Sequence, residues 1–182
     1  MAAEAESTTT SQPHATMDTG DLLPIDDIKR TIMIPIDGSE NSIRAFNWYV
    51  DNVKKDGDLL VFVNVIEPVI SSSVFGPLDA PPFYTTQAAE DGLEQKIAGG
   101  KVLCKEYLQR AKDNGVMSKA FLHIDSKPGR ALVDSCNDHN ISFVVMGNRG
   151  LGTIRRTFMG SVSDYVLHHA NRPVMIISPP EK

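Results

Sequence analysis

The chain has 182 residues, of which 41% are hydrophobic and 23% are charged, and its formal net charge is -5. This length can bury a core without disulfide or metal staples, and the composition excludes collagen-like and low-complexity chains. The longest uninterrupted apolar run, Leu59 to Val63, is far shorter than the ~20 residues of a membrane-spanning helix. We therefore expect one domain that neither crosses nor binds a membrane.

The acidic residues are concentrated near the beginning of the chain. Residues 1–30 hold six acidic and two basic residues, whereas the other 152 residues are nearly neutral. A nearly neutral body argues against nucleic-acid binding, which needs a clustered basic face. Residues 1–28 are rich in Ser and Thr and resemble neither a secretory signal nor an Arg-rich transit peptide, so they are predicted to be a disordered acidic tail.

Two cysteines, Cys104 and Cys136, make no disulfide framework. They are interpreted as small buried residues of a reducing compartment, and a cytoplasmic location follows by elimination.

The folded part, residues 29–180, begins with a β-branched run at 31–36 that predicts a strand and ends at Asp37-Gly38-Ser39. Apolar residues with helical spacing follow, and Ser39 is expected to cap that helix. Residues 59–66 then predict a fully buried strand. A long loop is expected at 67–86, because this segment holds four prolines and three consecutive serines.

The second half of the domain repeats the alternation of helix and strand. Helices are predicted over 87–114, from about 127 to 138 and over 160–170, and strands over 117–124, 141–146 and 174–177.

Near-continuous apolar strands that alternate with helices predict a parallel sheet with helices on both faces, a doubly wound, Rossmann-like α/β domain. Such sheets bind ligands beyond the carboxyl ends of their strands. The site is therefore expected after residues 36, 66, 124 and 146.

A glycine-rich segment follows the fourth predicted strand. It starts Gly147-Asn148-Arg149-Gly150-Leu151-Gly152 and ends at Gly160-Ser161, where a helix is expected to begin. Glycines let backbone amides approach an anion, and a helix N-terminus adds free amides and positive potential. The segment therefore predicts a phosphate cradle, although a surface loop with solvated arginines is the plainer alternative.

Several named phosphate and hydrolase motifs are absent. The only Gly-Lys pair, Gly100-Lys101, lacks the other residues of a Walker A loop, and Gly150 and Gly152 do not complete a dinucleotide fingerprint. The nucleophile elbow Gly-x-Ser-x-Gly is missing as well.

The spacing of Gly147, Gly150 and Gly160-Ser161 is similar to G-x2-G-x9-G-[ST], the ATP-binding signature of the universal stress protein family. The resemblance includes Ile34-Pro35-Ile36-Asp37-Gly38-Ser39, Val63-Asn64-Val65-Ile66 and Asn171-Arg172-Pro173-Val174, and it spans about residues 29–179. It implies five parallel strands in the order 3-2-1-4-5 and a homodimer formed through the last strand.

The same resemblance implies a binding site for ATP with Mg²⁺ or Mn²⁺. Asp37 would lie against the adenine, the backbone at Val65 would bind the base, and Ser161 with the amides of Val162 and Ser163 would hold phosphoryl oxygens. The residues expected at the site are Pro35, Asp37, Val65, Met146, Gly147, Arg149, Gly150, Gly160, Ser161, Val162 and Ser163.

Three functions remain open from the sequence. The first is an ATP-binding protein of the stress response that acts as a nucleotide-dependent switch or binding module, with little or slow hydrolysis. The second is a slow ATPase or nucleotidyl-transfer enzyme on the same fold, although no catalytic or metal-ligating residue is assigned. The third is an interaction scaffold whose loop binds phosphate adventitiously.

Overall fold

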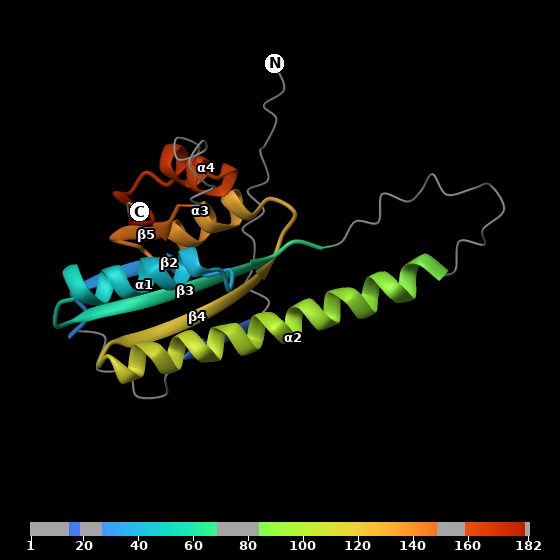
Figure 1. The fold of residues 1–182 in the computed structure, drawn as a ribbon, viewed down its shortest axis with the longest axis horizontal. Helices are drawn as coiled ribbons and strands as arrows, with labels where there is room; N and C mark the ends of the chain where they lie inside the picture. Colours follow the sequence, from blue (N-terminus) through green and yellow to red (C-terminus); the bar gives the residue numbers. More distant parts are fainter. Residues whose placement is uncertain (1–14, 19–26, 69–83, 149–158, 181–182) are drawn as a thin grey trace, which may run out of the picture.

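The computed structural model describes residues 15–18, 27–68, 84–148 and 159–180 (Figure 1). Their elements, in chain order, are β1 Ala15–Asp18, β2 Arg30–Pro35, α1 Glu40–Asn52, β3 Asp58–Ile66, α2 Tyr84–Asp113, β4 Met117–Ile124, α3 Pro128–Asp138, β5 Phe143–Gly147, α4 Ser161–His169 and β6 Val174–Ile177.

The described strands form one sheet in the order β1-β4-β3-β2-β5-β6. The five strands from β2 to β6 are parallel wherever they pair, and they follow the order that the resemblance implied. The predicted α/β class with a parallel, doubly wound sheet is confirmed.

The structure differs from the prediction at residues 15–18, which were expected to belong to a disordered tail. This segment forms β1, which pairs antiparallel with β4 from Ala15 opposite Leu122 to Asp18 opposite Lys119. Two interactions explain the ordering of this short segment: the exposed edge of β4 offers unpaired backbone groups, and Met17 packs against the core.

The sheet separates two apolar layers. Alternate residues of β3 point to opposite faces, so Leu60 and Phe62 pack with α1 and α2, while Val61 and Val63 pack with α3 and α4. Burial on both faces explains why this strand reads as a continuous apolar run.

Helix α2 begins at Tyr84, three residues before the predicted start, and extends beyond the end of the sheet (Figure 1). Most of the predicted 67–86 loop, residues 69–83, lies outside the described residues. Gly100 lets the helix pack closely, because a Cβ there would lie 2.7 Å from Leu122 Cδ1 and 2.8 Å from Asn64 Oδ1. None of the described helices, α2 included, is both long and apolar enough to cross a bilayer.

A partly buried ionic cluster joins the amino ends of β2 and β3. Arg30 donates to both carboxylate oxygens of Asp58 at 2.7 and 2.6 Å, and Tyr49 Oη donates to Asp58 Oδ2 at 2.7 Å. Burial alone would raise the pKa of Asp58, but the hydrogen bonds from Arg30, Tyr49 and the Lys55 amide outweigh it and lower the pKa. This cluster fixes one end of the sheet and leaves the carboxyl ends of the strands free to form a site.

Candidate functional site

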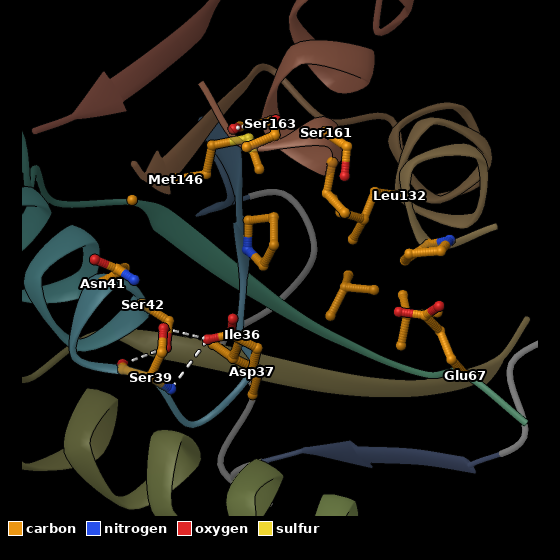
Figure 2. A pocket seen from close by; sticks show the side chains of 17 residues that line it. Ile36, Asp37, Ser39, Asn41, Ser42, Glu67, Leu132, Met146, Ser161 and Ser163 are labelled. Atoms are coloured by element: carbon orange, nitrogen blue, oxygen red, sulfur yellow. Dashed lines mark hydrogen bonds between the residues drawn. The ribbon is translucent and has the colours of Figure 1, made fainter. Parts of the chain in front are cut away.

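A cavity of about 390 Å³ lies at the carboxyl ends of β2, β3 and β5, bounded by the first turns of α1, α3 and α4 (Figure 2). Its size falls within the range of pockets that hold small-molecule ligands. Its lining includes the predicted residues Pro35, Asp37, Val65, Met146, Gly147, Gly160, Ser161, Val162 and Ser163. The other two predicted residues, Arg149 and Gly150, lie outside the described part of the chain.

Asp37 stands in the turn between β2 and α1. Its Oδ1 accepts hydrogen bonds from Ser39 N at 3.0 Å and from Ser39 Oγ at 2.6 Å, while the side chain stays exposed. Gly38 has a φ of +74°, a conformation that favours glycine. The turn therefore presents a carboxylate of fixed orientation at the mouth of the cavity.

Ser39 occupies the N-cap position of α1, as predicted, but its hydroxyl makes no capping hydrogen bond to the helix. The hydroxyl donates to Asp37 instead. The cap prediction is therefore right about the position and wrong about the interaction.

Asn64 of β3 holds the end of β2 in place. Its side chain is 7% exposed, and its Nδ2 donates to the carbonyl oxygen of Ile36 at 2.7 Å. Val65, the next residue, lines the cavity. Asn64 belongs to the motif Val63-Asn64-Val65-Ile66, but no role was predicted for it from the sequence.

The end of β5 lies tight against α1. A Cβ on Gly147 would overlap the carbonyl oxygen of Asn41 and lie 2.6 Å from its carbonyl carbon, so packing alone requires glycine here. Arg44 of α1 donates from Nη2 to the Asn148 carbonyl at 2.7 Å and to the Ile177 carbonyl at 3.3 Å. The start of the glycine-rich segment is thus anchored to α1 and β6.

Helix α4 points its amino end into the cavity. Gly160 is the N-cap residue, and the Asp164 amide donates to its carbonyl at 2.9 Å. The amides of Ser161, Val162 and Ser163 precede this first helical bond and have no acceptor within the helix. Together with the helix dipole they make an anion-binding end. The Ser163 hydroxyl donates to the Gly160 carbonyl at 2.9 Å, which leaves Ser161 as the hydroxyl available to a ligand.

The described lining carries carboxylates but no Lys, Arg or His. Asp37 and Glu67 supply its two carboxyl groups, so a bound anion would rely on the α4 amides for its protein contacts within the described residues. Nor do three or more His, Cys, Asp or Glu side chains gather in a metal-binding arrangement anywhere in those residues. A Mg²⁺ ion would fit this site as a companion of nucleotide phosphates. Mg²⁺ usually keeps several water ligands and takes the others from substrate phosphates and one or two carboxylates.

Several residues that line the cavity were not predicted from the sequence, namely Ile36, Ser39, Asn41, Ser42, Val63, Glu67, Pro128 and Leu132. Glu67 and Pro128 follow the strands that end at 66 and 124, where the fold class already placed the site. Asn41 and Ser42 stand in the first turn after Asp37, so helix geometry predicts that they face the same edge.

Comparison with known proteins supplies the family. The family model described as the universal stress protein family matches residues 29–178. The chain belongs to the universal stress protein family.

One relative is universal stress protein PHOS34 of Arabidopsis thaliana, which is 30% identical over 170 residues. The match covers 84% of this chain and 63% of that protein, so the chain spans less than two thirds of this relative.

Solved structures of the family share the fold. A universal stress protein family protein from Arabidopsis thaliana, solved with AMP bound, has a TM-score of 0.60 at 19% identity and covers 83% of this chain and 92% of its own. A universal stress protein in complex with cAMP has a TM-score of 0.58 at 21% identity, with coverages of 82% and 96%.

Proposed function

We propose that this universal stress protein binds adenine nucleotides, ATP among them, and acts as a nucleotide-dependent switch or binding module in the stress response. One observation carries the proposal. The amides at the start of α4, which have no acceptor within the helix, front the same 390 Å³ cavity as Asp37 and Val65, which come from two different strand ends. A nucleotide needs such a combination, because its phosphates and its base require different surroundings.

The two sides of the cavity differ in chemistry. Pro35 and Val65 offer an apolar wall and backbone groups for a base, and Asp37 offers a carboxylate acceptor. Ser161 and the neighbouring amides offer donors for phosphoryl oxygens, and they lie across the cavity from Asp37 in Figure 2. The relatives with AMP and cAMP add support, since they carry adenine nucleotides on the same fold.

A proline substitution tests the phosphate side without removing the helix. Ser161 is the first residue of α4, and Gly160 before it has φ -64° and ψ 148°, which a following proline accepts. Ser161→Pro deletes one amide N–H and the hydroxyl, so we expect the affinity for Mg·AMP and Mg·ATP to fall about tenfold or more. Ser161→Ala keeps the amide and is the matched control, with a smaller loss.

Thermal unfolding with each nucleotide provides the measurement. Ligand at ~100 times its Kd adds about 2.7 kcal/mol to stability, so adenine nucleotides should raise the Tm of the wild type clearly. A wild type whose Tm is unchanged by millimolar Mg·AMP and Mg·ATP would overturn the proposal and favour the scaffold function.

We propose binding without rapid turnover. Phosphoryl transfer needs positioned metal ligands and a group that orients the nucleophile. Phosphate release by the wild type that disappears in Ser161→Pro would instead favour the slow ATPase or nucleotidyl-transfer alternative.

We also propose that the protein works as a cytoplasmic homodimer paired through β6. This strand is the outer edge of the sheet beside β5, and Val174, Met175 and Ile176 are only partly buried. An apolar edge with unpaired backbone groups favours pairing with a second copy. The free, buried thiols of Cys104 and Cys136 suit a reducing compartment.

A further inference from the structure

A series of hydrogen bonds runs from the C-terminal part of α2 to the Asp37 carboxylate. Tyr107 Oη of α2 donates to Ser42 Oγ at 3.0 Å, and Ser42 Oγ donates to the Ser39 carbonyl at 2.9 Å. Ser39 in turn donates from its amide and its hydroxyl to Asp37 Oδ1. The last three members of this series, Ser42, Ser39 and Asp37, line the cavity, whereas Tyr107 does not (Figure 2).

The hydroxyl of Tyr107 is not required for packing. Tyr107 is 1% exposed, and its ring packs edge-to-face against Phe46 and tilted against Phe62, with ring centroids 5.9 and 5.2 Å apart. A phenylalanine would make the same ring contacts without bringing a polar atom into the core. Burial raises the pKa of Tyr107, so the phenol remains a donor at neutral pH.

The turn that carries Asp37 has little packing of its own. The 390 Å³ cavity lies on one side of it, and a second, more open hollow of about 540 Å³ lies on the other side, towards α2. Asp37 lines both spaces, and the nearest side-chain atom to an ideal Cβ at Gly38 is Leu103 Cδ1 at 3.8 Å. Hydrogen bonds must therefore fix the turn where packing does not.

We propose that Tyr107 is a positioning residue for the nucleotide site: acting through Ser42 and Ser39, it fixes the Asp37 carboxylate and so couples the placement of α2 to adenine-nucleotide affinity. The inference rests on the proposed function. Ser42 Oγ accepts a hydrogen bond from Tyr107 and donates one to the Ser39 carbonyl. The bond that it accepts strengthens the bond that it donates.

The test compares two buried tyrosines that each lose one hydroxyl. Tyr107→Phe should weaken AMP binding by about three- to tenfold in titration calorimetry. Tyr49→Phe is the matched control, because Tyr49 is equally buried but its hydroxyl donates to Asp58 at the opposite end of the sheet. We expect Tyr49→Phe to lower stability and leave the Kd for AMP unchanged.

Two further readouts separate positioning from general loosening. Ribose 5-phosphate carries the sugar and a phosphate but no base, so Tyr107→Phe should leave its affinity unchanged if the effect passes through Asp37 at the base. In a double-mutant cycle with Ser42→Ala, the effect of Tyr107→Phe on AMP affinity should vanish, because its acceptor is already gone. Ser42→Ala alone should weaken AMP binding, and this variant serves if Tyr107→Phe does not fold.

The outcomes distinguish the two proposals. A wild type that binds neither AMP nor ATP would remove the proposed function and this inference with it. A wild type that binds AMP, with Tyr107→Phe or Ser42→Ala binding it equally well, would overturn the inference alone. Equal losses for AMP and ribose 5-phosphate, or additive effects in the cycle, would also overturn it.

Discussion

At Gly147 the chain of β5 passes so close to α1 that no side chain fits between them. The same residue lines the cavity and belongs to the glycine pattern from which a phosphate site was predicted. In the structure the close contact with Asn41 leaves no room for a side chain at this position. A residue that matches a ligand-binding motif can therefore also be required for packing.

A pair of glycine substitutions tests this local packing. Gly147→Ala places a Cβ against the Asn41 carbonyl, so α1 must shift, and we expect the free energy of unfolding to fall by about 1–3 kcal/mol. Gly99→Ala is the control, because an added Cβ there has no neighbour within 4 Å and alanine favours the helix; it should stabilise by up to ~1 kcal/mol. Urea unfolding measures both, and a Gly147→Ala variant as stable as the wild type would contradict the packing argument.

Between β4 and α3 lie one buried and one half-buried histidine, in a largely apolar layer. His123 of β4 is 1% exposed; its Nε2 lies 3.0 Å from Ser135 Oγ, and its Nδ1 has no partner among the described residues. His139, at the end of α3, stacks on Phe121 with ring centroids 3.8 Å apart. Burial lowers the pKa of both imidazoles, and the charge of His139 lowers that of His123 further.

We therefore expect the packing of β4 against α3 to be destabilised in mild acid. The unfolded chain binds protons at these histidines near their ordinary pKa of 6.5, whereas the folded chain resists protonation. The free energy of unfolding should thus be highest above pH 7 and fall as the pH drops through about 6.5 towards the lower folded pKa. Urea unfolding from pH 7.5 to 5.5 measures the slope, which His123→Gln should reduce; an unchanged slope in this variant would refute the assignment.

On the scale of the whole molecule, the sequence predicted those parts of the fold that have local patterns, and nine of the residues expected at the site line one cavity. The strands of the parallel sheet follow apolar runs, Gly160 stands in a glycine-rich segment before a predicted helix, and Asp37 and Val65 were expected at the site through the resemblance to the family. Tyr107 has no such pattern, because it reaches the site through Ser42, which is 65 residues away in the chain. The pairing of β1 with β4 could not be predicted from a local pattern either, because it depends on a sheet edge that exists only once the sheet has formed.

If the proposed homodimer forms through β6, hydrogen exchange at this strand should depend on protein concentration. Pairing with a second copy would shield the edge amides of Val174 to Ile177, so their hydrogen exchange should slow as the protein concentration rises. Amides of β3, at the centre of the sheet, should show no such dependence and provide the control. Sedimentation that gives a monomer at every concentration would contradict the dimer.

The strand β1 makes the two edges of the sheet unequal. It covers β4 from Lys119 to Leu122, and within the described residues it is an outermost strand of four residues, whereas β6 presents its edge on the other side of the sheet. Two copies joined through β6 by a twofold axis would each turn a short outer strand away from the contact, and very short edge strands resist further pairing. Such an assembly would be finite: it would close at two copies, because the described residues offer no second edge like that of β6 from which an open ribbon of sheets could grow.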